Sequence, residues 1–486
     1  MKIDPAGPIP IYFQLKTLLK EAIQEGRFGP DHRIPTEDEL CAEHGISRTP
    51  VHRALSELAE EGVLVRYRRR GTFVHPHWLE RSEGGPELRV VVLDERWEPL
   101  FRAAAPRGAR LNFARFPQPD LHQAITHAVA EAHAPDLSMI DSVWVAEFAA
   151  AGFLRPLHEV IPNLDQIVAD IVEPFESAYR HNGQIYALPA EADVAGLWFR
   201  RSPLDRLGID PPTTWNELRK AVRAVHRAGH ERPLVMTAGS RGQETTTYSL
   251  LALLASNGVE ILRDGAVTLD SPGAIEALRF LRSFLDEGLM PPEVVNYEYD
   301  RPVRMLAAGK AVFIISGSYE FHRLIDRTGR PATDIDRIFG FVPIPAGPSG
   351  PPASLAGGMA YGIFRQAARP DLAGQLLQRL VAPAAMADMA RSTGQIPPRR
   401  SAVPLAIPYL SFLGSTAALL ENAVTRPVTR VYARVSEQLQ VMVEAVLIHR
   451  RSPAAAVARA ADRIGAITGL PVKHATKAAS VASGGG

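Results

Sequence analysis

The chain has 486 residues, of which 46% are hydrophobic and 22% are charged. Because a domain typically takes roughly 100–200 residues, this length predicts several domains with ordinary globular cores. The formal net charge is only +1, so the whole chain lacks the strong positive charge that favours nucleic-acid binding. The single cysteine, Cys41, excludes an internal disulfide and a zinc site built from several thiolates.

Two further absences bear on location. Residues 1–14 contain one lysine and no apolar run long enough for a signal peptide. No stretch of the chain approaches the ~20 uncharged apolar residues that a membrane-spanning helix needs. We therefore expect a cytoplasmic protein without a membrane partner.

Residues 1–78 carry the pattern of three short helices. Apolar side chains recur at helical spacing from Tyr12 to Ile23. Thr36 with Glu39 three residues later is a capping-box pattern, which predicts the start of a second helix. Ser47 is the expected N-cap of a third helix, which runs to Gly62. The chain therefore begins with a compact helical unit.

Two short strands follow these helices, at 63–67 and 72–74, with a turn at 68–71 between them. Helices joined by a short glycine turn and followed by a hairpin are typical of a winged helix-turn-helix. The third helix would enter the major groove N-terminus first, and the hairpin arginines would contact phosphates or the minor groove. The predicted DNA contacts are Ser47, Arg48, Thr49, His52, Arg53, Arg68, Arg69, Arg70, Gly71 and Thr72.

Acidic and basic residues are equally numerous in residues 1–78, so net charge does not reveal this surface. The basic side chains gather at Arg48, Arg53 and 66–70, whereas the acidic ones fall mainly at 37–43 and 57–61. This arrangement predicts a modest nonspecific affinity for DNA, which leaves room for a ligand to change occupancy.

Four strings in this unit can be compared with a known family: Pro-Ile-Tyr at 10–12, Ile-Pro-Thr-Glu at 34–37, Gly-Ile-Ser-Arg-Thr at 45–49 and Gly-Thr-Phe-Val at 71–74. With them, residues 9–75 resemble the GntR family of bacterial transcription regulators. The resemblance implies operator DNA as a partner and a homodimer on two-fold symmetric sites. Asp38 stands where the family usually has arginine, and Arg69 where it often has glycine, so different base contacts are expected.

The rest of the chain follows a linker. Residues 79–87 are polar and contain glycine, without periodicity. Residues 88–470 alternate strand-like runs with amphipathic helices, which predicts an α/β domain of two lobes. We call this part the effector domain and residues 1–78 the DNA-binding unit. Residues 471–486 form an expected disordered tail.

Common catalytic motifs are missing from the effector domain. It has no Gly-x-Ser-x-Gly elbow, no glycine-rich phosphate loop and no dinucleotide fingerprint. Some GntR regulators carry a pyridoxal-phosphate aminotransferase-like domain, whose lysine must form a Schiff base. Before the tail, Lys220 and Lys310 are the only candidates here, and neither has the expected surroundings. We therefore expect no enzymatic activity, no metal and no cofactor, with the aminotransferase-like regulator as the less favoured alternative.

Several strings of the effector domain occur in a recognisable order. They include Asn-Gly-Gln-Ile-Tyr-Ala-Leu-Pro at 182–189, Gly-Ile-Asp-Pro-Pro-Thr-Thr-Trp at 208–215, Met-Leu-Ala-Ala-Gly-Lys-Ala at 305–311 and Thr-Gly-Gln-Ile-Pro-Pro-Arg at 393–399. Over about residues 88–465 the order and spacing resemble the maltose-binding-protein-like, carbohydrate-binding branch of the type II extracellular solute-binding proteins. The resemblance implies a two-lobed, periplasmic-binding-protein-like α/β fold that closes over a ligand.

The expected ligand is a mono- or oligosaccharide. Sugars are held by aromatic faces against their C–H surfaces and by carboxylates or amides at their hydroxyls. The resemblance places such residues after strand ends and in crossover segments: Glu95, Trp97, Asp141, Trp144, Glu191, Asp193, Tyr248, Tyr319, Gly358 and Arg399. Each aromatic side chain could equally be a core residue, and Arg399 could bind an acidic ligand or lie on the surface.

Together these expectations describe a ligand-responsive transcription factor that controls carbohydrate uptake or catabolism. A small molecule in the cleft would change operator affinity only as far as it prefers one arrangement of the protein. The alternative is a DNA-binding protein whose effector domain is a degenerate interaction platform that binds no small molecule.

Overall fold

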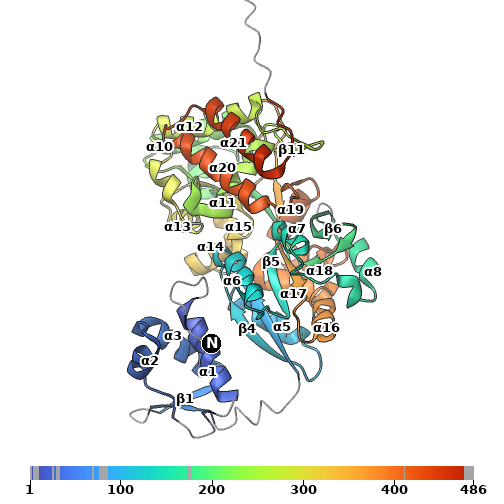
Figure 1. The fold of residues 1–486 in the computed structure, drawn as a ribbon. Helices are drawn as coiled ribbons and strands as arrows, with labels where there is room; N and C mark the ends of the chain where they lie inside the picture. The colour runs from blue at the N-terminus through green and yellow to red at the C-terminus, as the bar shows by residue number, and fades with distance from the viewer. Residues whose placement is uncertain are drawn as a thin grey trace, which may run out of the picture. The chain divides into compact units, whose positions relative to one another are not determined.

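In a computed structural model of the protein, the described residues are 3, 10–24, 27–28, 33–67, 71–75, 86–172, 175, 177–409 and 411–474. Internal contacts divide the chain into two compact units. The first unit consists of Met1–Ser138 with Ile363–Leu376, and the second of Met139–Gly362 with Leu377–Gly486. Figure 1 shows the helices and strands that make up these units.

The first unit opens with three helices and a hairpin, which confirms the predicted winged helix-turn-helix. The elements are α1 (Ile11–Gln24), α2 (Glu37–His44), α3 (Arg48–Glu60), β1 (Leu64–Tyr67) and β2 (Gly71–Val74). The strands pair antiparallel, with Leu64 opposite Val74 and Tyr67 opposite Gly71. Leu15, Val51 and Leu58 pack in the core between the helices.

Local capping explains where the second helix begins and ends. Thr36 accepts a hydrogen bond from the Glu39 amide at 3.2 Å, and the Glu39 carboxylate accepts one from the Thr36 amide at 2.6 Å. This reciprocal capping box satisfies two otherwise unpaired donors, as the sequence predicted. Gly45 ends the helix with φ +66°, a conformation that glycine adopts without steric cost. The turn before α3 is thereby fixed.

The remainder of the first unit is a parallel α/β segment. Its elements are β3 (Glu87–Val92), η1 (Glu95–Trp97), α5 (Glu98–Ala104), β4 (Arg110–Arg115), α6 (Gln118–Ala130), the start of β5 (Leu137–Asp141) and most of α16 (Pro370–Leu380). β3 pairs parallel with β4 and with β5. The buried Asp136 carboxylate accepts hydrogen bonds from the amides of Arg89 and Ala368, each at 2.7 Å. It thus joins the strand to the returning segment before α16.

Two larger sheets organise the α/β part of the chain. The five-stranded sheet has the order β4-β3-β5-β16-β8, where β16 is Met359–Ile363 and β8 is Ala187–Pro189. The six-stranded sheet has the order β10-β13-β9-β15-β17, with β14 also paired to β9. Its strands are β9 (Asp193–Arg200), β10 (Leu234–Val235), β13 (Phe313–Gly317), β14 (Phe339–Val342), β15 (Leu355–Gly357) and β17 (Val424–Thr425).

Helices surround the strands of the second unit. Those of its first half are η2 (Ser142–Trp144), α7 (Val145–Ala150), η3 (Leu157–Glu159), α8 (Leu164–Ala169), η4 (Ser177–Tyr179), α9 (Arg201–Leu207), α10 (Trp215–Arg227), η5 (Ser240–Gly242) and α11 (Gln243–Ala255). Those that follow are α12 (Pro272–Asp286), η6 (Pro292–Asn296), α13 (Arg301–Ala307), α14 (Glu320–Thr328), α15 (Ala332–Ile338), α17 (Pro383–Thr393), α18 (Val403–Ala406), η7 (Ile407–Tyr409), α19 (Ser411–Leu420), α20 (Tyr432–Leu447) and α21 (Pro453–Thr468). Short ladders add β6 (Arg180–His181), β7 (Gln184–Ile185), β11 (Leu262–Arg263) and β12 (Ala266–Val267).

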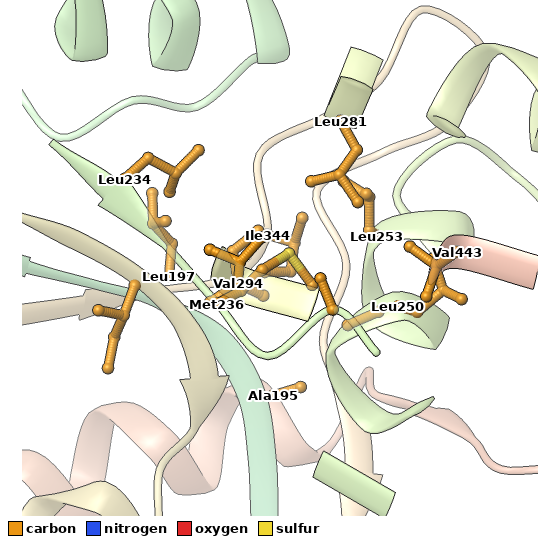
Figure 2. Close-up of a cluster of buried hydrophobic side chains, with 14 of the residues drawn as sticks. Ala195, Leu197, Leu234, Met236, Leu250, Leu253, Leu281, Val294, Ile344 and Val443 are labelled. Carbon is orange, nitrogen blue, oxygen red and sulfur yellow. The ribbon is translucent and has the colours of Figure 1, made fainter. Parts of the chain in front are cut away.

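The main core of the second unit lies between the six-stranded sheet and its helices. Leu197, Leu234, Leu250, Leu281 and Val443 come from different elements and meet there, as Figure 2 shows. β9 is buried at every position except its last residue. Other strands pair with β9 on both sides, and helices cover the sheet there. Near the C-terminus, α20 and α21 lie side by side (Figure 1). β9 is therefore a central, buried strand of the six-stranded sheet.

One helix cap and two predicted boundaries can be compared with the fold. Thr214 caps α10 with a full capping box to Glu217. Most of the predicted linker 79–87 lies outside the described residues, as does the predicted tail beyond residue 474. The start of that tail is described, and Val472 there bridges to Val267. None of the helices in the described part of the chain is long and apolar enough to cross a membrane.

Candidate functional site

The N-terminal end of α3 presents an exposed polar surface. Ser47, Arg48, Thr49 and His52 are all exposed there, and Ser47 is the N-cap residue. Exposed donors and acceptors at this end of a recognition helix are the groups that reach base edges in the major groove. The structure therefore brings together these four predicted DNA contacts.

Glu37 organises two of these side chains. One carboxylate oxygen accepts a hydrogen bond from Arg48 Nε at 3.0 Å, and the other lies 2.9 Å from His52 Nδ1. The hydrogen bond to His52 lowers the pKa of Glu37 most, burial opposes it, and the hydrogen bond from Arg48 lowers the pKa further. Glu37, which sequence reasoning did not select, thus orients both predicted base-reading residues.

The other predicted DNA contacts have different surroundings. The Arg53 guanidinium lies 3.7 Å from the ring centroid of Tyr12 and pairs with Glu57 at 3.1 Å. Part of its charge and hydrogen-bonding capacity is therefore already used within the DNA-binding unit. Gly71 and Thr72 lie on β2, where Gly71 adopts φ +111°. Arg68, Arg69 and Arg70 lie outside the described residues.

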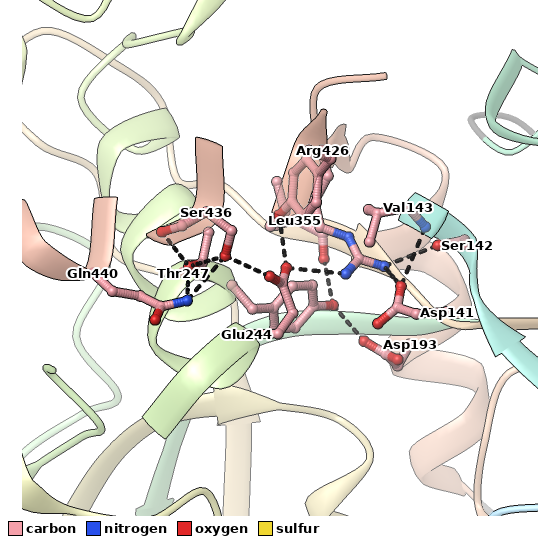
Figure 3. A network of polar contacts seen from close by, with 12 residues as sticks. Asp141, Ser142, Val143, Asp193, Glu244, Thr247, Leu355, Arg426, Ser436 and Gln440 are labelled. Atoms are coloured by element: carbon pink, nitrogen blue, oxygen red, sulfur yellow. Dashed lines mark hydrogen bonds and ion pairs between the residues drawn. The ribbon is translucent and has the colours of Figure 1, made fainter. Parts of the chain in front are cut away.

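A second polar site lies in the second unit and is built around Arg426. Its guanidinium donates to Asp141 at 2.8 Å and to the Ser142 hydroxyl at 2.8 Å, and to Glu244 at 3.1 Å (Figure 3). Only 5% of the arginine side chain is exposed. We call Asp141, Ser142, Asp193, Glu244, Tyr248, Arg426, Tyr432 and Ser436 the polar centre.

Strand and helix ends position the carboxylates of this centre. Asp141 is the last residue of β5, and its side chain also accepts the Val143 amide at 3.3 Å. Glu244 stands in the first turn of α11, where the helix dipole favours a negative charge. Asp193 opens β9. Arg426 thereby links a carboxylate of the five-stranded sheet to one beside the six-stranded sheet.

Hydroxyl groups complete the network. Tyr432 donates to Glu244 at 2.6 Å, and Ser436 donates to the other oxygen of that carboxylate at 2.8 Å. Tyr248 donates to Asp193, and its oxygen lies 2.8 Å from the Leu355 carbonyl oxygen. Each buried carboxylate of the centre is therefore hydrogen-bonded, which offsets much of the cost of its burial.

Burial and charge shift the ionisation of these groups in opposite directions. Burial would lower the pKa of Arg426, but Asp141, Tyr432 and Glu244 together hold it well above its ordinary value. Burial raises the pKa of Asp193 to about 6, although the hydrogen bond from Tyr248 opposes this rise. Burial also raises the pKa of Glu244, against the opposing effect of Arg426. The arginine is therefore the fixed charge of the centre.

Four more predicted ligand residues lie close to this centre. Burial, followed by the charge of Asp193, raises the pKa of Glu191 well above its usual range. The Tyr319 ring lies 6.2 Å from that of Tyr248, between centroids. A β-carbon at Gly358 would come within 2.2 Å of the Glu191 carbonyl oxygen, and the Gly358 carbonyl accepts the Ser142 amide at 3.2 Å. Trp144, in η2 directly after Ser142, is 8% exposed and packs near Phe148.

The remaining predicted ligand residues have other environments. Glu95 and Trp97 belong to the first unit, where Glu95 is exposed and Trp97 is buried in η1. Arg399 pairs with Asp170 at 2.7 Å and donates to the Val381 carbonyl at 2.7 Å. These contacts form an ion pair within the fold, and 13% of the Arg399 side chain is exposed.

Sequence reasoning missed the residues that tie the centre together, namely Arg426, Glu244, Tyr432 and Ser436. Arg426 follows the two-residue strand β17, and no local pattern distinguishes it from the exposed Arg430 four positions later. Glu244 could have been noticed, because a carboxylate at the start of a helix that is buried along most of its length is unusual.

The polar centre offers carboxylates, hydroxyls and one guanidinium, which bind hydroxyl-bearing or charged groups. Among the described residues no cluster of His, Cys, Asp and Glu is arranged to hold a metal ion.

Comparison with known proteins gives two separate matches along the chain. The family model of bacterial extracellular solute-binding proteins matches residues 101–408. That of bacterial regulatory proteins of the gntR family matches residues 11–74. The first family comprises binding proteins and the second comprises transcription regulators, and neither is an enzyme family.

Individual relatives agree with this division. A putative binding protein of Brucella abortus (strain 2308) is 26% identical over 404 residues, covering 80% of this chain and 95% of the relative. The HTH-type transcriptional repressor NagR of Bacillus subtilis (strain 168) is 44% identical over 85 residues, which are 18% of this chain and 35% of the repressor. Maltose-bound MalE3 of T. maritima shares the fold, with a TM-score of 0.70 and 23% identity over 78% of this chain and 99% of that protein.

The C-terminal part therefore has the two-lobed fold of maltose-binding proteins, as the sequence predicted. The chain belongs to the bacterial extracellular solute-binding protein family, and it carries at residues 11–74 a winged helix-turn-helix of the gntR family of bacterial regulators.

Proposed function

We propose that this protein is a ligand-responsive transcription factor that acts in the cytoplasm as a homodimer. The DNA-binding unit binds operator DNA, and the effector domain binds a mono- or oligosaccharide whose uptake or catabolism the protein regulates. The single observation that carries this proposal is the presence of a DNA-binding and a solute-binding module in one chain. A binding module joined to a DNA reader has a ready use as a sensor.

The polar centre supports a ligand site in the effector domain. It combines Asp141, Asp193 and Tyr248, which the sequence predicted as ligand residues, with the arginine that connects elements of two sheets. A ligand that exchanges with any of these contacts changes the balance between arrangements of the sheets. By linkage, operator affinity follows that change only if one arrangement binds DNA better.

The test has two stages on the full chain. The operator is first selected from random duplexes, and sugars are screened by thermal shift. Operator binding is then measured by fluorescence anisotropy with and without each sugar that raises Tm. We expect at least one sugar to change operator affinity by about 5-fold or more, within the usual range of allosteric coupling. Sugars that bind without any effect on operator affinity would overturn the sensor proposal.

One observation favours a second candidate, an effector domain that binds no small molecule. Arg426 already satisfies Asp141 and Glu244, so the centre needs no ligand to neutralise these two carboxylates. In this case alanine at Asp193 or Tyr319 leaves regulation intact in cells, provided that the variants fold. Loss of regulation with an unchanged Tm and unchanged operator affinity in vitro would favour the sensor instead.

A further inference from the structure

The charges at the polar centre do not balance. Four carboxyl groups, those of Asp141, Glu191, Asp193 and Glu244, act on one another and on the single guanidinium of Arg426. Arg426 pairs directly with only two of them, Asp141 and Glu244. The nearby Arg323 pairs with Glu320 at 3.1 Å, so it adds no net positive charge. Glu191 and Asp193 therefore have no cationic partner among the described ion pairs.

Two buried polar atoms beside this surplus have no hydrogen-bond partner among the described residues. Glu191 is 3% exposed, and one of its oxygens accepts the Met359 amide at 2.9 Å, while Oε2 is unpaired. Tyr179 is 2% exposed, and its hydroxyl is also unpaired. A buried polar group without a partner is costly, and most native proteins avoid it. Each of these two oxygens can therefore accept a hydrogen bond from a donor group of a ligand.

These atoms belong to one neighbourhood. Tyr179 ends η4, which contacts β8, and Glu191 follows β8 by two residues. Burial and then the charge of Glu191 raise the pKa of Tyr179, and the charge of Glu191 also acts on Tyr361. The charged and titratable groups that face Glu191 and Asp193 are Asp141, Tyr179, Tyr248, Tyr319, Glu320, Tyr361 and Arg426. Of these, Arg426 alone is a cation.

Glu191 can hold a proton, because burial and the charge of Asp193 raise its pKa well above the usual range. A protonated carboxyl is neutral, so this proton removes one negative charge from the centre. An ammonium group would do the same while donating hydrogen bonds to Glu191 and Asp193. A neutral hydroxyl group would supply the hydrogen bond but not the charge.

We propose that the ligand of the effector domain carries an ammonium group, which binds at Glu191, Asp193 and Tyr179. This inference rests on the proposed function, and within it the ligand is an amine-bearing carbohydrate. On binding, the Glu191 carboxyl loses its proton to solvent and becomes a carboxylate paired with the ligand ammonium. Binding of the ammonium group is therefore coupled to proton release, and no covalent bond to the ligand forms or breaks.

The experiment uses the full chain and matched probes. Glucosamine and galactosamine are compared with glucose, galactose and N-acetylglucosamine by calorimetry and thermal shift. We expect the amines to bind at least 10-fold more tightly than their neutral counterparts. Between pH 5.5 and 7 the affinity for the amines should rise with pH. Calorimetry in buffers of different ionisation enthalpy should show net proton release when the amines bind.

Variants separate the proposed contact from a general loss of structure. Glu191→Gln should abolish the preference for amines, because glutamine cannot supply the negative charge. The Tm of this variant should stay within a few degrees of the wild-type value. Glu437→Gln, at an exposed position of α20, should leave the preference unchanged. Neutral sugars that bind as well as the amines and change operator affinity would overturn the cation inference and leave the proposed function standing. Failure of every probe to bind would count against both.

Discussion

The guanidinium of Arg426 donates a hydrogen bond of 2.8 Å to the carboxylate of Asp141, although 285 positions separate them in the chain. The same guanidinium reaches Glu244 at 3.1 Å, so one side chain joins the end of β5 to the start of α11. All three side chains are largely buried, with exposed fractions of 5% for Arg426, 7% for Asp141 and 17% for Glu244. Residue 426 therefore supplies the cation of this ion triad, shared by two buried or mostly buried carboxylates.

Replacing Arg426 by glutamine should strongly destabilise the effector domain. Removing one partner of a buried ion pair leaves an uncompensated charge and typically costs about 3–5 kcal/mol. We expect a loss of this size in the unfolding transition of the effector domain, measured by urea titration. Arg430→Gln is the matched control, because it follows the same Thr-Arg pattern on an exposed position. Equal stability of the two variants would show that the triad contributes little.

Asp193 should make stability depend on pH in an unusual direction. Burial raises the pKa of Asp193 to about 6, above the value of about 3.9 in an unfolded chain. Its stabilising contribution is therefore fully present below about pH 4 and is lost as the pH rises through about 6.

Asp193→Asn removes this titration, so its stability relative to wild type should increase between pH 4 and pH 7, by roughly 1–3 kcal/mol. Urea titrations at each pH measure the difference. Asp210→Asn, at an exposed position, should show no such trend. A pH-independent difference for Asp193→Asn would contradict the burial of a titrating carboxyl.

Gly358 should tolerate no side chain. It adopts φ +146°, and a β-carbon there would meet the Glu191 carbonyl oxygen at 2.2 Å. Gly358→Ala should therefore cost at least about 2 kcal/mol, since backbone strain adds to the clash. Gly414→Ala is the control, because that glycine lies inside α19 with its nearest neighbour atom 3.6 Å from the new carbon. This second variant should be neutral or slightly stabilising in thermal unfolding.

Glu37 should determine how selectively the DNA-binding unit reads its operator. Glu37→Gln weakens the contacts that orient Arg48 and His52, so the ratio of specific to nonspecific affinity should fall about 10-fold. Nonspecific affinity itself should rise slightly, because a negative charge near phosphates is removed. Glu43→Gln, on an exposed position of α2, removes the same charge without touching either side chain. A fall of similar size in both variants would assign the effect to charge alone.

Much of the fold could be predicted from local patterns. The capping boxes at Thr36 and Thr214 use contacts within four residues, and both are present. The exposed end of α3 follows from helical periodicity, so the exposure of Arg48 and His52 could be predicted without tertiary information. Trp97 shows the limit of this approach, because a tryptophan after a strand end fits a ligand site and a core equally well, and here it is buried.

The centre of the candidate site depends on contacts that no local pattern carries. Asp141, Glu191, Asp193 and Tyr248 were predicted because carboxylates and aromatic side chains follow strand ends or stand in known strings. Arg426, the ion-pair partner of Asp141, could not be identified in the same way, since Arg426 and Arg430 both follow a threonine and only the fold places carboxylates beside the first of them. The ion pair of Arg399 could not be predicted either, because its partner Asp170 lies 229 positions earlier in the chain.

β17 is only two residues long, and it pairs with β15 through Leu355 opposite Val424 and Ala356 opposite Thr425. Since successive side chains of a strand point to opposite faces, a shift of one residue would turn the guanidinium of Arg426 away from both carboxylates. A single inserted or deleted residue between Leu420 and Arg426 would thus remove the ion triad without changing any of its members. In related chains, the spacing of this segment should therefore be kept more strictly than the identity of the exposed residues within it.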